Sequence, residues 1–114
     1  MDNNIHIKLL LSSHIIKLTD ASEFMAGLEI KNTGSEELNF DISKTELWVN
    51  GERNIAWDLA VQNGTLINLR IPAFSSEKVK WPLGDALFTS SGNYKLNLKW
   101  DDKVVTSKVR VEGD

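Results

Sequence analysis

Apolar and polar residues alternate with a period of two along most of the chain, which is the pattern of half-buried β-strands. The clearest alternating runs lie at 5–11, 24–31, 38–43, 45–49, 65–71, 78–81, 94–100 and 105–111. Asn50-Gly51 follows one of these runs and is a strong signal for a two-residue hairpin. Pro72 ends another run, because proline cannot donate to a central strand ladder. The pattern therefore predicts eight or nine short strands.

Some segments carry signals that the alternation alone does not explain. Asn32-Thr-Gly34 joins two strands and predicts a hairpin whose glycine has a positive φ. A further alternating run fits either a strand or an irregular segment: Ile55, Trp57, Leu59 and Val61. Asn63-Gly64 predicts a turn before a strand with Ile67 inward. Residues 85–88 predict at most one helical turn, with Asp85 suited to its cap.

The length and composition favour one ordinary globular domain. The chain has 114 residues, of which 41% are apolar and 25% charged, so one core accounts for residues 1–114. No long amphipathic helix is present, and crossovers between parallel strands are therefore not expected. These features predict an all-β fold, an immunoglobulin-like antiparallel β-sandwich.

Charge and cysteine content narrow the classes of partner and compartment. The net charge of −3 argues against binding to nucleic acid or to an anionic membrane surface. No run approaches the roughly 20 apolar residues that cross a bilayer. The chain has no cysteine, which suits a reducing compartment and excludes disulfides and thiolate metal sites. We expect a cytoplasmic protein; the alternative is a secreted one whose signal peptide has been removed.

Three segments resemble parts of bacterial immunoglobulin-like domains. They are the runs at 29–40, at 73–81 and at 91–100, where Ser91-Gly-Asn-Tyr94 opens a strand. Their order is similar to that of the Bacillus intracellular proteinase inhibitor family (BsuPI type), although Pro72 to Ser76 replaces the family's usual Gly or Pro-Gly turn. The resemblance implies a sandwich in which the Tyr94 hydroxyl bonds to nearby backbone. It implies a proteinase inhibitor, but no inhibitory residue is carried over.

No residue pattern predicts a catalytic or metal site. His6 is expected on the outward face of its strand and His14 in a bend, which is a poor arrangement for zinc. Asp101-Asp102 reads as a hairpin turn, because adjacent strand residues point to opposite faces and do not converge as an acid–base pair. We therefore predict that the protein is not an enzyme and uses no metal and no cofactor.

Aromatic residues give the candidate partner-binding surface. Trp81 and Trp100 continue inward faces and are expected in the core, whereas Trp48 alternates against Leu47 and Val49 and should point outward. Trp57 fits either core or surface. An exposed patch that contacts a partner is predicted from five residues: Trp48, Asn50, Gly51, Trp57 and Phe74.

Basic residues suggest a second surface. Lys95 and Lys99 share one outward face, as do Lys108 with Arg110 on the neighbouring strand and Lys78 with Lys80 on a third. If these strands adjoin, they form a basic face that suits an acidic protein or polysaccharide; defence against aggregation is the plainer explanation. Leu10 points away from its neighbours Leu9 and Leu11, so we expect something to cover it, and a dimer through an edge strand is one way.

The sequence thus favours a non-enzymatic protein-binding module. Its most specific version is a proteinase inhibitor that presents the loops at 32–37, 50–54 and 72–76 from one end of the sandwich. The alternative is a structural or accessory domain of a larger cell-surface or carbohydrate-active protein, in which tryptophans stack on sugar rings. The partner would then be a protease or another protein in the first case and a carbohydrate in the second.

Overall fold

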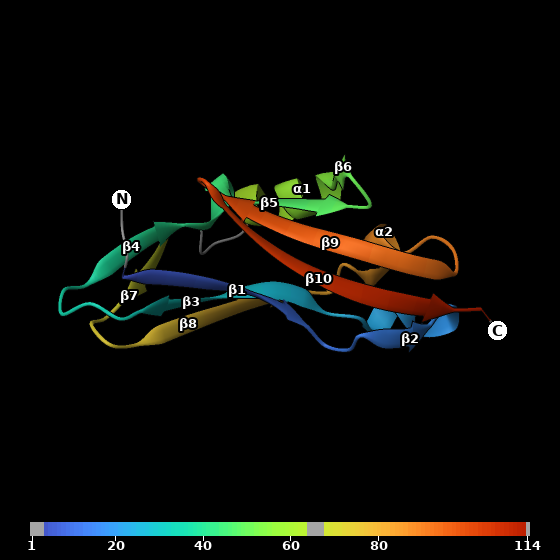
Figure 1. The fold of residues 1–114 in the computed structure, drawn as a ribbon, viewed down its shortest axis with the longest axis horizontal. Coiled ribbons are helices and arrows are strands. Elements are labelled where there is room, and N and C mark those ends of the chain that lie inside the picture. The colour runs from blue at the N-terminus through green and yellow to red at the C-terminus, as the bar shows by residue number, and fades with distance from the viewer. Residues whose placement is uncertain (1–3, 64–67, 114) are drawn as a thin grey trace.

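Strands dominate the structure, which confirms the all-β, sandwich-like fold. The structure, a computed structural model, describes residues 4–63 and 68–113. Figure 1 shows its elements, which in chain order are β1 (Ile5–Leu11), β2 (Ile15–Lys17), the 3₁₀ helix η1 (Leu18–Glu23), β3 (Ala26–Asn32), β4 (Leu38–Asp41), the 3₁₀ helix η2 (Ile42–Lys44), β5 (Glu46–Val49), β6 (Glu52–Arg53), α1 (Ile55–Asn63), β7 (Asn68–Ile71), β8 (Ser76–Trp81), α2 (Gly84–Leu87), β9 (Gly92–Trp100) and β10 (Lys103–Glu112).

Two main sheets form the layers of the sandwich. One has three strands in the order β1-β3-β8, and the other has five in the order β2-β10-β9-β5-β6. A small sheet, β4-β7, extends one end of the molecule (Figure 1). The N-terminal segment changes sheets at residues 12–14, because β1 pairs with β3 whereas β2 pairs with β10. The β2–β10 pair is parallel, so the prediction of a wholly antiparallel sandwich is wrong at this one pair.

The core lies between the sheets and is built from the inward half of each alternation. Fully buried side chains come from both layers: Leu28, Ile30, Leu47, Leu96 and Leu98. Gly27 allows β3 to lie close to β8, since a Cβ at this position would come within 1.8 Å of the Val79 carbonyl oxygen. Trp81 and Trp100 pack against this core, as predicted, and remain partly exposed.

The predicted hairpin at Asn32-Thr-Gly34 is wrong. β3 pairs with β1 and β8, whereas β4 pairs with β7, so the chain crosses to another sheet here. The Asn32 side chain is buried and organises this crossing: its Oδ1 accepts from the Gly34 amide at 2.9 Å, and its Nδ2 donates to the Ile71 carbonyl at 3.1 Å. The bend is an asparagine turn, closed by this side-chain bond to the Gly34 amide. Gly34 does not have the positive φ that the hairpin prediction required.

Residues 55–63, which the alternation assigned to a strand or irregular segment, form helix α1. Asn54 caps the helix, since its Oδ1 accepts from the Trp57 amide at 2.8 Å. Trp57 and Val61 face the core one helical turn apart, while Ile55 and Leu59 are exposed. With α1, η1 and η2 present, the prediction of at most one helical turn is also wrong.

The remaining local predictions have mixed outcomes. The predicted turn at 85–88 is α2, but Leu83 is its N-cap residue and Asp85 lies in the first turn without capping. β9 and β10 form the predicted hairpin, with Leu98 opposite Val105. The Tyr94 hydroxyl donates to the Ser90 carbonyl at 2.7 Å, as the resemblance implied. The predicted turn at Asn63-Gly64 and the inward Ile67 fall on or beside residues 64–67, outside the described part of the chain.

Candidate functional site

The outward-pointing residues of the five-stranded sheet form the best-defined candidate surface. Leu47, Leu96 and Val109 are buried, which directs their neighbours on β5, β9 and β10 to the opposite side. We call this side the outer face. Its residues are Glu46, Trp48, Lys95, Asn97, Lys99, Val104, Thr106, Lys108 and Arg110.

Trp48 points to the outer face, as predicted from its alternation, and is half-buried. Its indole Nε1 donates to Glu46 Oε1 at 2.9 Å. The Lys99 ammonium lies 4.1 Å from the centroid of its ring, within the range of a cation–π contact. On the neighbouring strands, Trp48 is opposite Asn97 and Arg53. Two polar partners thus contact the half-buried ring, Glu46 at its edge and Lys99 over one of its faces.

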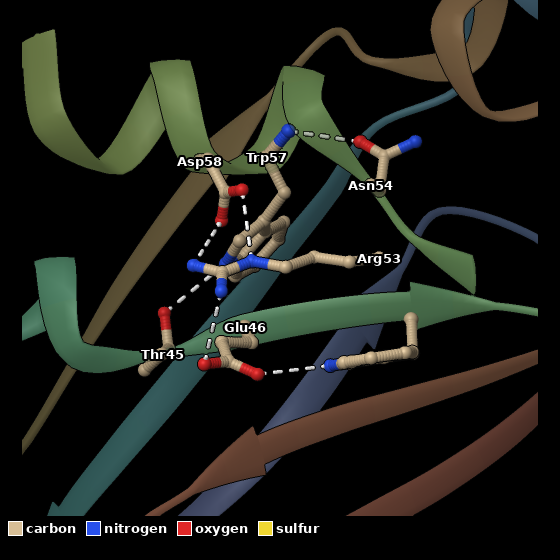
Figure 2. A network of polar contacts seen from close by, with 7 residues as sticks. Thr45, Glu46, Arg53, Asn54, Trp57 and Asp58 are labelled. Carbon is tan, nitrogen blue, oxygen red and sulfur yellow. Dashed lines mark hydrogen bonds and ion pairs between the residues drawn. The ribbon is translucent and has the colours of Figure 1, made fainter. Parts of the chain in front are cut away.

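An ion-pair network beside Trp48 links α1 to this sheet. Figure 2 shows the Arg53 guanidinium between the carboxylates of Asp58 on α1 and Glu46 on β5. Arg53 Nε lies 3.0 Å from Asp58 Oδ2, and Nη1 lies 3.4 Å from Glu46 Oε2. The hydrogen bond to Asp58 and the charges of both carboxylates raise the pKa of Arg53. Glu46 therefore contacts both Arg53 and Trp48, and the arginine stays charged at any physiological pH.

Trp57 is not part of any exposed patch, which corrects its assignment as a partner-binding residue. Its side chain is fully buried, and its Nε1 donates to Thr45 Oγ1 at 3.1 Å. Its ring packs edge-on against Trp81 of the other sheet, with centroids 5.2 Å apart. Trp57 is therefore the side chain by which α1 closes the space between β5 and β8.

Phe74 is exposed, at 72% of its surface, but lies away from the outer face. It belongs to the turn between β7 and β8, where its φ is 57° and its amide donates to the Gly34 carbonyl at 3.2 Å. This turn lies at the end of the molecule that holds β4 and β7 (Figure 1). The predicted patch that combined Trp48, Trp57 and Phe74 does not exist as one surface.

Asn50-Gly51 forms the predicted hairpin turn between β5 and β6. Both residues have positive φ values, 50° and 85°, as a two-residue turn of this kind requires. Asn50 also extends the pairing of β5 with β9: its amide donates to the Lys95 carbonyl and its Oδ1 accepts from the Lys95 amide, each at 2.8 Å. The side chain of Asn50 is thereby held beside Lys95.

The three loops proposed for inhibition do not gather at one end of the sandwich. Loops 32–37 and 72–76 meet, since Asn32 Nδ2 donates to the Pro72 carbonyl at 3.2 Å. Loop 50–54 lies instead beside α2, where Asn50 and Ala86 line the same groove of about 420 Å³. The arrangement on which the inhibitor mechanism rested is therefore wrong.

The basic residues of β9 and β10 adjoin as predicted. Lys95 and Lys108 are directly opposite each other, and Thr106 Oγ1 donates to Asn97 Oδ1 at 2.7 Å in the next row. Lys78 and Lys80 do not join them, because β8 belongs to the other sheet. A groove of about 480 Å³ lies over the basic residues, and its polar lining comprises His14, Asn50, Asn93, Lys95, Lys108 and Arg110. We call it the cationic groove.

The remaining titratable candidates form no catalytic or metal-binding group among the described residues. His6 is exposed on β1, as predicted, and His14 Nδ1 lies 3.0 Å from the Lys108 carbonyl oxygen. Asp101 and Asp102 form the turn between β9 and β10. Among residues 4–63 and 68–113, no group of three or more His, Cys, Asp or Glu side chains is placed to hold a metal ion. No helix in that part of the chain is long and apolar enough to cross a membrane.

Comparison with known proteins gives a likeness of fold. No family model and no curated protein matches the sequence. The β-glucosidase from Listeria innocua in complex with glucose is similar, with a TM-score of 0.51 and 12% identity over 96% of this chain and 16% of that chain. The same enzyme with isofagomine, and a mutant with laminaribiose, each have a TM-score of 0.50 at the same identity and coverage. This chain thus spans 16% of the enzyme chain that it resembles.

Proposed function

We propose that the chain is a non-catalytic accessory domain of a carbohydrate-active protein and that its outer face binds glycan. The observation that carries this proposal is the half-buried ring of Trp48 on the outer face, with Glu46 at its indole nitrogen and the Lys99 ammonium over the ring, where a stacking sugar would take its place. Tryptophan combines a flat apolar ring with a polar edge, which suits a sugar that has an apolar face and a rim of hydroxyl groups. Asn97 and Thr106 continue the row with amide and hydroxyl groups that donate and accept hydrogen bonds.

The likeness of fold supports the same proposal. Nearly the whole chain superposes on a small part of the β-glucosidase, which is the relation expected of one domain within a larger enzyme. The likeness by itself concerns the fold, and one sandwich fold serves many functions. The glycan assignment therefore rests on the outer face. The proteinase inhibitor reading has no support from the comparisons or from the placement of its loops.

We also assign the sandwich to the immunoglobulin-like class. In that class the strands of each layer are contributed alternately along the chain, and a tyrosine near the start of the penultimate strand bonds to upstream backbone. Here β1, β3 and β8 are interleaved in sequence with β5, β9 and β10, and Tyr94 makes that bond to Ser90.

The test is a binding measurement with the purified domain and a panel of soluble and insoluble polysaccharides. We expect Trp48→Ala to weaken glycan binding about tenfold or more, because it removes the stacking ring. Phe74→Ala is the control, since it removes an exposed aromatic ring from the far end of the molecule. Both variants should keep the far-ultraviolet circular dichroism of the wild type.

Three results would contradict glycan binding. The first is equal glycan binding by wild type and Trp48→Ala, and the second is binding lost only in Phe74→Ala. The third is stoichiometric inhibition of a protease by an uncut domain that binds no glycan, which would favour the inhibitor function instead. A fourth result, hydrolysis of an aryl β-glucoside by the domain alone, would contradict the non-catalytic part of the proposal.

A further inference from the structure

The cationic groove lies on the outer face next to Trp48. Asn50 and Trp48 are two residues apart on the same side of the β5 hairpin, and Lys95 and Asn97 are two residues apart on β9. Residues that lie side by side across the strands therefore form two neighbouring rows, about 7 Å apart along the strand direction. One row is Asn50, Lys95 and Lys108, and the other is Trp48, Asn97 and Thr106. One extended polymer can lie across both rows.

The charges of the two groove lysines, Lys95 and Lys108, are not neutralised by the neighbouring residues. Lys95 has Asn50 and Lys108 on either side and Asn93 and Asn97 along its own strand, so none of these neighbours is acidic. In the described part of the chain, neither lysine takes part in an ion pair. Like charges placed directly opposite each other weaken a sheet. The Lys95–Lys108 pair therefore destabilises the fold, and it concentrates positive charge in a chain whose net charge is −3.

Protection of a sheet edge does not account for Lys95. Lysines that prevent aggregation lie on strands with an unpaired side. β9 is paired on both sides, with β5 and with β10, so Lys95 is in the middle of its sheet. The third cation, Arg110, has a partial partner in Glu112 at 3.7 Å, and both of its neighbours on β2 and β9 are uncharged: Ile15 and Asn93.

We infer that the cationic groove binds the anionic groups of an acidic polysaccharide, its carboxylates or sulfates, while Trp48 stacks on a neighbouring sugar. This inference rests on the proposed function and names its substrate class. The oxygen of the Asn97 amide is engaged by Thr106 and that of Asn50 by the Lys95 amide, so both amide nitrogens can donate outward to hydroxyl groups. Nucleic acid fits less well, because its single strands are bound by several aromatic platforms among the cations, and this face has one.

The experiment compares polygalacturonate with its fully methyl-esterified form, which has the same backbone and no charge. We expect the wild type to bind polygalacturonate at least tenfold more tightly than the ester, with an affinity that falls as salt is added. Lys95→Gln/Lys108→Gln should lose about tenfold or more in affinity for polygalacturonate. Lys31→Gln/Lys80→Gln is the matched control, because it removes two exposed charges from the other sheet and should bind as the wild type does.

The outcomes separate the inference from the proposed function. Equal binding of polygalacturonate and its ester, lost in Trp48→Ala, would overturn the acidic class and leave glycan binding in place. No binding of any polysaccharide would overturn both. Tighter binding of polyglutamate than of either polysaccharide would overturn the inference in favour of an acidic protein, and an unaltered affinity of Lys95→Gln/Lys108→Gln would place the site elsewhere. Dextran sulfate, run in parallel, tells whether sulfate or carboxylate is preferred.

Discussion

At the scale of single residues, two buried polar side chains stabilise segments whose structure the hydrophobic pattern does not predict. Asn32 and Thr45 are fully buried, and both are hydrogen-bonded. Thr45 Oγ1 accepts from Trp57 Nε1 at 3.1 Å and donates to the Ile42 carbonyl at 2.7 Å. Because a buried polar group without a partner costs more free energy than a hydrogen bond contributes, such sites are sensitive to loss of one partner.

We expect Thr45→Val to lower the free energy of unfolding by about 1–3 kcal/mol, because it leaves the Trp57 indole N–H buried without an acceptor. Urea denaturation followed by circular dichroism measures this change. Thr106→Val is the control: it removes the same atom from an exposed hydrogen bond and should stay within about 0.5 kcal/mol of the wild type. Equal changes in the free energy of unfolding for the two substitutions would show that the buried hydrogen bond stabilises the fold no more than the exposed one.

At the scale of elements, the sequence predicts strands better than it predicts their partners. The alternation located β1, β3, β5, β8, β9 and β10, because each has one face on the core. It did not show that the chain crosses between sheets at Asn32, since that crossing depends on contacts with Ile71 and Pro72 far along the sequence. The direction of Trp48 and the shared outward face of Lys95 and Lys108 were predictable from the period-two alternation and the hairpin, whereas the pairing of these two lysines was not. The contribution of His14 to the groove was not, because it depends on the parallel pairing of β2.

Helix α1 shows why the apolar alternation at residues 55–61 did not predict the correct element. Trp57 and Val61 are four residues apart, a spacing that both a strand face and a helix face contain, so the core contacts alone fit either element. The deciding signals were local: Asn54 is a good N-cap, and Ala56 and Ala60 favour helix. Ile55 and Leu59, which completed the apparent alternation, are exposed.

This account of α1 predicts that Asn54→Ala lowers the free energy of unfolding by about 1 kcal/mol, because the Trp57 amide loses its acceptor. Asn54→Asp should keep nearly full stability, since aspartate caps equally well and its charge favours a helix N-terminus. Gln62→Ala, at an exposed position of the same helix, is a control expected to change stability little. If Asn54→Ala and Gln62→Ala have the same thermal midpoint, the cap does not hold the helix.

At the scale of the whole molecule, one core joins all three sheets and α1. Buried residues of the small sheet (Phe40, Leu69) and of α1 (Trp57, Val61) belong to the same cluster as those of both main sheets. Further contacts cross between layers, as where Phe40 packs on Trp100 with ring centroids 5.0 Å apart. No layer therefore has a core of its own that would let it unfold separately.

A shared core predicts that unfolding is a single cooperative transition. Far-ultraviolet circular dichroism reports mainly on the strands, whereas tryptophan fluorescence reports strongly on Trp57, Trp81 and Trp100 near α1 and the small sheet. We expect the two signals to give the same midpoint in urea, and Thr45→Val to shift both midpoints equally. A fluorescence midpoint clearly below that of circular dichroism would mean that α1 and the small sheet detach first. The outer face would then lose the Arg53–Asp58 ion pair beside Trp48 before the rest of the sandwich unfolds, and glycan binding should disappear at the lower midpoint.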